Sequence, residues 1–176
     1  FGDLISNVLK LFRTRKNILA QYQQSFKYIL IDEFQDTNFA QNEMAILLAG
    51  DRKNINVVGD DDQSIYRWRG AAISNILQFK KHFPEAKVVT LNKNYRSTQE
   101  ILDRAYQMIQ FNNPDRLEVK EKVDKKLIAE RTDIGSVVEF NCSGRVENEA
   151  EFVAKKIKTL VREKKYEYRD FAILVR

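Results

Sequence analysis

The stretch that decides the fold is YILIDEFQDT, at residues 28–37. It is a short, continuous apolar run from Tyr28 to Ile31, followed at once by the carboxylates of Asp32 and Glu33. Buried strands of parallel sheets have this pattern, with polar residues at the carboxyl end. Open α/β sheets bind their ligands at that end of the strands. The stretch therefore indicates an α/β protein with a binding site beginning at residue 32.

Apolar periodicity on both sides of this stretch alternates between helix and strand. It predicts helices over residues 3–20, 40–49, 71–81, 97–111 and 147–164, and strands over residues 28–31, 55–58, 87–91, 136–140 and 171–175. Ser97 stands three residues before Glu100, which predicts a capping box at the start of the fourth helix. Residues 112–134 are polar and are expected to form a connector or an exposed loop. This alternation predicts an α/β fold with mostly parallel strands.

The composition is that of an ordinary folded protein. The 176 residues are 43% hydrophobic and 11% aromatic, with six glycines and two prolines, which excludes collagen-like and low-complexity chains. No apolar run approaches the roughly 18 residues of a membrane span, so we expect no membrane partner. Cys142 is the only cysteine, which leaves no disulfide partner and favours a reducing, intracellular setting. The net charge of +5 permits a polyanionic partner without identifying one.

Asp32 and Glu33 suit phosphate chemistry. An Asp at the end of a strand can hold Mg²⁺, directly or through water, and a neighbouring Glu can deprotonate an attacking water. The alternative is that two apolar residues followed by Asp and Glu form a common strand end that begins a solvated turn. These residues alone leave both interpretations open.

A second motif, VVGDDDQSIYRWRG, occupies residues 57–70 and also follows a predicted strand. Gln63 can bond both a phosphate oxygen and a water, as a nucleotide sensor must. Tyr66 and Trp68 alternate with arginines, which predicts a platform for nucleic-acid bases, each worth about 1–3 kcal/mol when stacked. The alternative is a core tryptophan, with Arg67 and Arg69 paired to the three preceding aspartates.

A third motif, LNKNYRST, occupies residues 91–98. Arg96 precedes a predicted helix and could reach a γ-phosphate as an arginine finger, which can supply roughly 10³ to 10⁵ in rate. The alternative is an arginine that pairs with a surface carboxylate. Two lysine-rich segments, residues 120–126 and the predicted helix over 147–164, are expected to be solvated surfaces.

Together these three segments resemble motifs II, III and IV of the superfamily 1 DNA helicases of the UvrD/Rep/PcrA type. The motifs match in order and approximate spacing, and weaker similarity extends over nearly the whole chain. The resemblance implies two RecA-like P-loop NTPase lobes with mostly parallel sheets. Residues 1–90 would be the later part of lobe 1A, with residues 1–24 returning from the 1B insertion. Residues 91–176 would be the early part of lobe 2A.

The resemblance implies ATP and Mg²⁺ as cofactors. Asp32 would bind Mg²⁺, and Glu33 would be the catalytic base of ATP hydrolysis. Gln63 would sense the γ-phosphate and couple it to the DNA site. Tyr95 would lie against the adenine, and Arg96 would be the arginine finger.

The resemblance also implies partners, namely single-stranded DNA, single-strand/duplex junctions and the remainder of a helicase chain. Tyr66 and Trp68 would stack on bases, and Arg69 would support their pocket. The parent protein would translocate in the 3′-to-5′ direction and serve DNA repair or replication, in the cytoplasm and on the nucleoid.

A P-loop requires Gly-x-x-x-x-Gly-Lys-Ser/Thr, and none of the six glycines is followed by lysine. We therefore expect a fragment that lacks motif I. The resemblance implies that motifs V and VI are missing as well, so we expect the fragment to be inactive by itself. Two alternatives stay open, a helicase–nuclease subunit of the RecB/AddA type and a catalytically dead DNA-binding or interaction module. The joint presence of Asp32, Glu33, Gln63 and Arg96 argues against the dead module.

Overall fold

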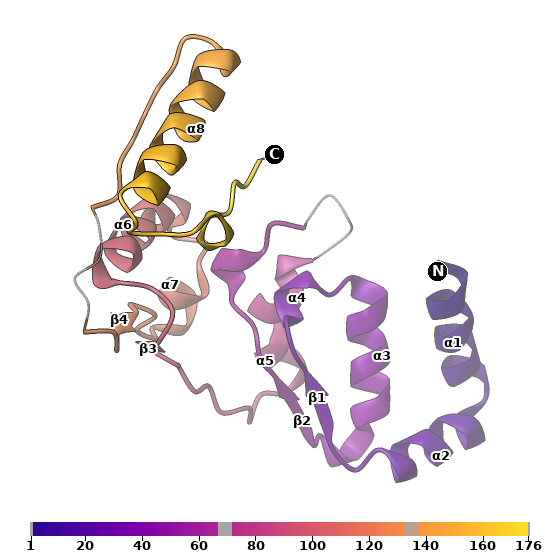
Figure 1. Ribbon diagram of the computed structural model, residues 1–176. Helices are drawn as coiled ribbons and strands as arrows, with labels where there is room; N and C mark the ends of the chain where they lie inside the picture. The colour runs from indigo at the N-terminus through magenta and orange to yellow at the C-terminus, as the bar shows by residue number, and fades with distance from the viewer. Residues whose placement is uncertain (1, 67–71, 133–134, 136, 176) are drawn as a thin grey trace. The chain divides into compact units, whose positions relative to one another are not determined.

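The computed structural model describes residues 2–66, 72–132, 135 and 137–175 (Figure 1). The chain forms two compact units, Phe1–Ile134 and Gly135–Arg176. Two residues with predicted DNA contacts, Trp68 and Arg69, lie outside the described residues.

The chain begins with two helices, α1 (Gly2–Thr14) and α2 (Lys16–Ser25). The single helix predicted over residues 3–20 is divided at Arg15, whose backbone lies outside the helical region at φ −117° and ψ 78°. Both helices pack against α3 (Phe39–Ala49). Leu9, Phe12 and Leu19 are buried between them, and the Phe12 and Tyr22 rings lie 5.5 Å apart. These contacts form the first part of the core.

The first sheet contains β1 (Ile29–Ile31) and β2 (Ile55–Val57), which pair in parallel with Ile31 opposite Val57. The predictions of strands at 28–31 and 55–58 are confirmed. Backbone hydrogen bonds continue beyond the strands, from Val58 N to Ile31 O at 2.8 Å and from Phe34 N to Val58 O at 2.9 Å. The segments that follow the two strands therefore begin side by side.

Short helices surround this strand pair. They are η1 (Phe34–Asp36), η2 (Gly50–Arg52), η3 (Asp61–Gln63), α4 (Ile73–Leu77) and α5 (Phe79–His82). The helix predicted over 71–81 is divided at Gln78, whose φ is −110° and ψ 5°. Phe34 is fully buried and meets Phe79 edge-on at 5.7 Å. The segment that follows β1 is therefore anchored in the core by Phe34.

The second sheet contains β3 (Lys93–Asn94) and β4 (Ile128–Ala129), again parallel. The strand predicted over 87–91 is wrong: in the described chain no segment forms a ladder with it, and Val89 is 79% exposed. Pairing begins later because Ile128 N bonds to Asn92 O and Glu130 N bonds to Asn94 O, both at 2.8 Å. A strand needs a partner as well as an apolar run.

Helix α6 (Gln99–Ile109) leads into η5 (Gln110–Asn112) and α7 (Leu117–Glu121). The predicted capping box is wrong, since Thr98 is the N-cap and no described side chain caps it. Asn94 Oδ1 instead accepts from Ser97 N at 2.8 Å. Residues 112–134 are also not a simple connector, because they contain α7 and β4.

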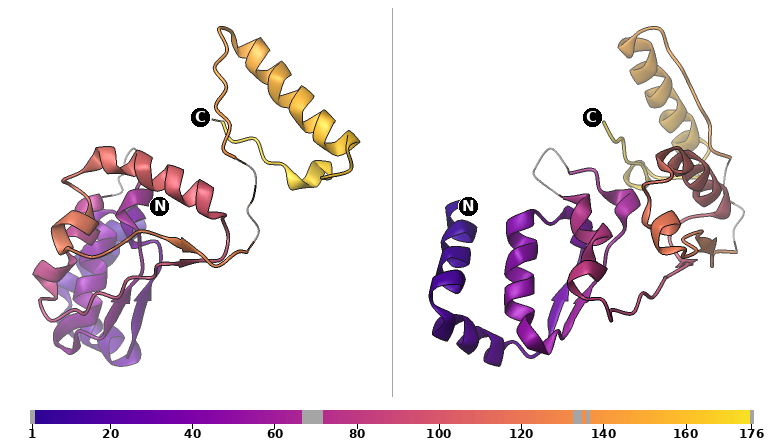
Figure 2. Two further views of the ribbon diagram at one scale, coloured as in Figure 1. Left: turned by 90° about the vertical axis from the view of Figure 1, so that its left-hand side faces the viewer. Right: turned by 180° about the vertical axis from the view of Figure 1, so that it is seen from behind.

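The second unit contains α8 (Val146–Arg162) and η6 (Tyr168–Asp170). Helix α8 confirms the prediction over 147–164, and Figure 2 shows it as one continuous helix from two further directions. Its lysines at 155, 156 and 158 are exposed, as expected for a solvated face. The strands predicted over 136–140 and 171–175 are not formed in the described residues, where Phe140 is 92% and Leu174 94% exposed.

Two further findings concern the helices and the single cysteine. None of the helices in the described ranges has the length and apolar character needed to cross a bilayer. Cys142 is a free, exposed cysteine. Both sheets are parallel, so the described chain is a mixed α/β protein with short parallel sheets, as the sequence predicts.

Candidate active site

The candidate site begins where β1 ends, at Asp32 and Glu33. Both side chains are exposed, and Asp32 Oδ1 accepts a hydrogen bond from Glu33 N at 2.9 Å. Glu33 has φ 49° and ψ 42°, in the left-handed region that costs a non-glycine residue energy. Residues held in such conformations cluster at functional sites. The turn therefore presents both predicted catalytic carboxylates to solvent.

Asp32 offers what a hard cation requires. Within the described residues its carboxylate has one hydrogen-bond donor, the backbone of Glu33, and it has no cationic partner. Mg²⁺ is bound in proteins by one or two carboxylates together with phosphates and water. The residue fits the predicted metal role.

Gln35 joins the two segments that follow the strands. Its side chain is buried, with 1% of the residue exposed. Its Nε2 donates to Glu33 Oε2 at 2.6 Å, and its Oε1 accepts from Asp60 N at 3.0 Å. Sequence reasoning missed this residue, because its contact with Asp60 spans 25 residues of sequence and no local pattern marks it.

Gly59 allows this close approach. A Cβ atom at this position would lie 2.8 Å from Gln35 Oε1 and 3.3 Å from Gln35 N. Both distances are shorter than ordinary van der Waals contact. A glycine is required here because the buried amide occupies the space of a side chain.

Asp60 continues the path to Gln63. Asp60 Oδ1 accepts from Asp62 N at 3.1 Å, which caps η3, and Oδ2 accepts from Gln63 Nε2 at 2.9 Å. Hydrogen bonds therefore connect Glu33, Gln35, Asp60 and Gln63 without a break. The structure brings together two of the predicted site residues, Glu33 and Gln63, through two intermediates.

The far end of the Glu33 segment is also fixed. Thr37 Oγ1 donates to Phe34 O at 2.6 Å, and Thr37 O accepts from Asn75 Nδ2 at 2.9 Å and from Ala72 N at 3.0 Å. Asn75 is buried at 4% exposure, so it holds this turn against α4. The segment that contains Glu33 is anchored on both sides of Gln35.

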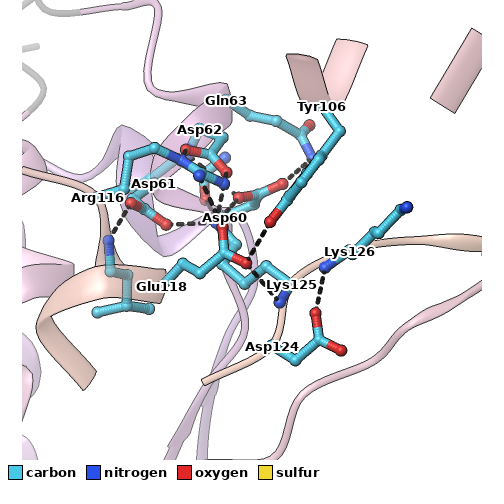
Figure 3. A network of polar contacts seen from close by, with 12 residues as sticks. Asp60, Asp61, Asp62, Gln63, Tyr106, Arg116, Glu118, Asp124, Lys125 and Lys126 are labelled. Atoms are coloured by element: carbon cyan, nitrogen blue, oxygen red, sulfur yellow. Dashed lines mark hydrogen bonds and ion pairs between the residues drawn. The ribbon is translucent and has the colours of Figure 1, made fainter. Parts of the chain in front are cut away.

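The three aspartates of the second motif form a cluster with cations from distant sequence (Figure 3). Lys125 Nζ lies 2.6 Å from Asp60 Oδ1, 2.5 Å from Asp61 Oδ1 and 2.9 Å from Asp62 Oδ2. The carboxylate oxygens lie within 4.8 Å of one another, a spacing that suits a cation, and here the cation is Lys125. The prediction that residues 120–126 form a solvated surface is wrong for Lys125, whose side chain is 14% exposed.

Arg116 is the second cation of the cluster. Its Nε and Nη2 donate to the two oxygens of Asp62, both at 2.7 Å, and its Nη1 lies 2.6 Å from Glu118 Oε2. Its side chain is 3% exposed. The alternative of aspartates paired to Arg67 and Arg69 falls on undescribed residues, and the partners within the described chain are Arg116 and Lys125.

Helix α6 supports the cluster from outside. Tyr106 Oη donates to Glu118 Oε1 at 2.8 Å, and the Arg116 guanidinium lies 5.6 Å from the centre of the Tyr106 ring. Leu117 N also donates to Asp61 Oδ2 at 2.6 Å. Side chains of α6 and α7 thus surround Arg116, and the backbone of α7 binds Asp61.

The cluster shifts the pKa of its members. Burial lowers the pKa of Lys125, but its bonds to the three aspartates outweigh burial and leave this pKa above its ordinary value. The bond to Asp62 raises the pKa of Arg116. Burial raises the pKa of Asp62, and the bonds from Arg116 and Lys125 bring it below its ordinary value. These three groups therefore stay charged at neutral pH.

The predicted residues of the third motif, Tyr95 and Arg96, are not part of this hydrogen-bonded path within the described chain. Tyr95 is 72% exposed, and Arg96 is exposed. Within the described part of the chain the Arg96 guanidinium makes no hydrogen bond or ion pair, while its carbonyl accepts from Arg131 Nη1 at 3.0 Å. Tyr66 is 40% exposed, beside the undescribed segment that contains Trp68. Among the described residues, neither Tyr95 nor the Arg96 side chain forms a hydrogen bond with Glu33 or Gln63.

Comparisons with known protein families place this α/β chain among the DNA helicases. Residues 1–84 match the family described as UvrD/REP helicase N-terminal domain, and residues 89–176 match the UvrD-like helicase C-terminal domain. The chain belongs to the UvrD-like helicase family, which confirms the resemblance seen in its motifs.

Individual relatives match the chain over its whole length. It is 46% identical to an ATP-dependent DNA helicase PcrA of Leuconostoc citreum, covering 100% of this chain and 22% of that protein. It is 44% identical to a probable DNA helicase II homolog of Rickettsia conorii, covering 100% of this chain and 26% of that protein. It is also 44% identical to PcrA of Staphylococcus aureus strain Mu50, covering 100% of this chain and 23% of that protein. The chain thus spans about a quarter of the length of the curated relatives it matches.

Proposed function

We propose that the whole protein is an ATP-dependent DNA helicase that moves 3′-to-5′ along single-stranded DNA and unwinds duplexes in repair or replication. The observation that carries this proposal is the path of hydrogen bonds from Glu33 through Gln35 and Asp60 to Gln63. It connects a candidate base with a candidate phosphate sensor at the carboxyl ends of two parallel strands. A motor that couples hydrolysis to movement needs such a connection.

In ATP hydrolysis, Glu33 would take the proton of the attacking water. The bond from Gln35 Nε2 fixes one oxygen of its carboxylate, so the other oxygen is left to face the water. Asp32 would hold Mg²⁺, which when bound neutralises charge on the phosphate oxygens. Gln63 is exposed, so its free amide oxygen can accept a hydrogen bond from a water, and the second N–H of its amide can donate to a γ-phosphate oxygen.

Two residues of the third motif would complete the nucleotide site. The guanidinium of Arg96 is exposed and has no partner in the described chain, so it is available to bind a phosphate. Tyr95 offers an exposed ring for the adenine. We propose that residues 1–90 and 91–176 belong to two RecA-like lobes, 1A and 2A, whose closure on ATP would bring Arg96 to the phosphates.

The DNA site would lie at Tyr66, Trp68 and Arg69. Stacking of bases on aromatic rings is tolerant of sequence, which suits a motor that moves along any strand. We propose single-stranded DNA and single-strand/duplex junctions as substrates, and the cytoplasm, at the nucleoid, as the place of action. The rest of the helicase chain would supply the P-loop.

The proposal is tested by Glu33→Gln in the full-length protein. We expect the hydrolysis of ATP stimulated by single-stranded DNA to fall by about 10² to 10⁴-fold, the range for loss of a general base, while DNA binding persists. Glu85→Gln, at an exposed position away from the site, is the matched control. Equal hydrolysis by the Glu33→Gln variant and the wild type would overturn the catalytic assignment. Unwinding of duplexes with a 3′ or a 5′ single-stranded tail tests the direction.

A further inference from the structure

We infer that Lys125 is a positioning residue for Gln63 and that it acts through Asp60. The inference rests on the proposed function, because it concerns the residue assigned as γ-phosphate sensor. It gives the segment that matches the C-terminal helicase domain control over a residue in the segment that matches the N-terminal domain.

The contact is direct on both sides of Asp60. Lys125 Nζ bonds to Asp60 Oδ1 at 2.6 Å, and Gln63 Nε2 bonds to Asp60 Oδ2 at 2.9 Å. Among the described residues, the bond to Asp60 Oδ2 is the only hydrogen bond of the Gln63 side chain, and the residue is exposed. The orientation of Gln63 therefore depends on a carboxylate whose other oxygen is held by Lys125.

Charge explains why Lys125 is needed. Within the described chain, Lys125 is the cation that contacts all three aspartates, whereas Arg116 bonds only to Asp62 of the three. Asp61 is nearly sealed from water, with 1% of its side chain exposed. Like charges in such a site repel strongly. Without Lys125 we expect the three carboxylates to separate, which would move Asp60 and release Gln63.

The position of Lys125 in the chain makes this contact a coupling device. Lys125 lies 65 residues beyond Asp60 in sequence, after α7, and belongs to the segment that matches the second helicase domain. Any rearrangement that withdraws Lys125 from the aspartates removes the restraint on Gln63. The sensor would then be ordered only while this contact between the two domain segments is made.

Lys126 is a natural control. It has the same charge and neighbours Lys125, but its side chain is 55% exposed and lies 3.8 Å from Asp103, away from the aspartate cluster. A change at this residue removes a lysine from the same segment without touching the path to Gln63.

The experiment uses the full-length helicase chain with Lys125→Gln, Lys125→Arg and Lys126→Gln, each with and without Gln63→Ala. The kcat and KM of ATP hydrolysis on single-stranded DNA are measured, with thermal melting as a check of folding. We expect Lys125→Gln to lower kcat by about 10- to 100-fold, the usual loss from a misplaced catalytic group. Lys125→Arg should recover most of this loss, and Lys126→Gln should leave kcat within about twofold.

The deciding result is the behaviour in the Gln63→Ala background. If Lys125 acts through Gln63, Lys125→Gln should lower kcat there by less than about twofold further, since coupled sites are not additive. A full additional loss would show independent action and overturn the inference, as would an unchanged kcat of Lys125→Gln alone. If Lys125→Gln melts at assay temperature, Asp60→Asn replaces it, with the same expected loss and the same test against Gln63→Ala.

The outcomes separate this inference from the proposed function. If ATP hydrolysis depends on Glu33 but is insensitive to Lys125, the positioning role fails and the helicase assignment stands. If hydrolysis is absent in the wild type or indifferent to Glu33→Gln, the proposed function itself fails.

Discussion

The side-chain amide of Gln35 lies 2.6 Å from the carboxylate of Glu33. The buried amide nitrogen of Gln35 thus donates to the exposed carboxylate of Glu33, and its amide oxygen accepts from the backbone N–H of Asp60 at 3.0 Å. Gln35 thus links the candidate base by hydrogen bonds to the segment that follows β2. Such second contacts orient catalytic groups.

Gln35→Ala tests this relationship. We expect the ATPase activity of the full-length protein to fall by roughly 10- to 100-fold, because Glu33 loses the donor that orients it. The free energy of unfolding should fall by about 1–3 kcal/mol, because the Asp60 N–H loses its acceptor. Gln24→Ala, at an exposed position on α2, is the control for both measurements. Unchanged activity in Gln35→Ala would contradict an orienting role.

Gly59→Ala should be destabilising by about 1–3 kcal/mol, the usual effect of overpacking. The added methyl group would meet Gln35 Oε1 at 2.8 Å and the backbone N of Gln35 at 3.3 Å, and the backbone atom cannot rotate away. Gly144→Ala is the matched control, since no described atom lies within 4 Å of the new methyl group, and we expect a change within about 0.5 kcal/mol. Urea unfolding measures both, and equal midpoints would refute the tight contact.

Acid should weaken the aspartate cluster. The pKa of Asp62 in the folded protein lies below its ordinary 3.8, so its contribution to stability is present above about pH 4 and is lost as pH falls through the lower folded value. The contribution of Lys125 to stability has the opposite pH dependence. It is present below the ordinary pKa of 10.5 and is lost as pH rises through the higher pKa of the folded protein. Between about pH 5 and pH 10 the two contributions should be constant. Asp62→Asn should flatten the fall of unfolding free energy below pH 4, and an identical acid profile in this variant would argue against the shift.

The 176-residue chain by itself should show no appreciable ATPase activity, since its sequence contains no Gly-x-x-x-x-Gly-Lys-Ser/Thr to hold the triphosphate. Release of phosphate, with and without single-stranded DNA, is the measurement, and the Glu33→Gln chain sets the background. Turnover that single-stranded DNA stimulates and Glu33→Gln abolishes would show this expectation to be wrong.

Single-stranded DNA should quench the fluorescence of Trp68, the only tryptophan of the chain. Stacking on a base is the reason, and the affinity should fall with added salt because DNA phosphates are contacted. A labelled oligonucleotide followed by anisotropy establishes saturation independently. An unmoved emission spectrum at saturating DNA would favour a tryptophan that packs within the protein.

The sequence predicts those elements whose signals are local. Residues 28–31 and 55–58 have an apolar run with a clear end, and the helix at 147–164 has a complete amphipathic pattern, so all three are found. The strand predicted at 171–175 fails because its apolar residues find no ladder partner in the described chain. The capping box at Ser97 fails because Thr98 is the N-cap and because Asn94 Oδ1 accepts from the Ser97 N–H that Glu100 would have bonded.

In the candidate site, too, the sequence predicts residues that stand in local motifs and misses those that depend on distant contacts. Asp32, Glu33 and Gln63 stand in motifs, so the sequence identifies them as candidates. Arg116 and Lys125 contact Asp62 across 54 and 63 residues of sequence, and no local pattern marks such a pair. In sequence, Lys125 is one more lysine in a charged run. Only the fold distinguishes it from Lys126.

The left-handed backbone of Glu33, at φ 49°, has a consequence for variation at this position. That conformation costs an ordinary residue roughly 1–2 kcal/mol, and glycine almost nothing. A glycine here would relieve this cost, but it would also remove the carboxylate that we propose as the base. A library of variants ranked by thermal tolerance would therefore favour glycine at residue 33, and only a screen for turnover would select the proposed base.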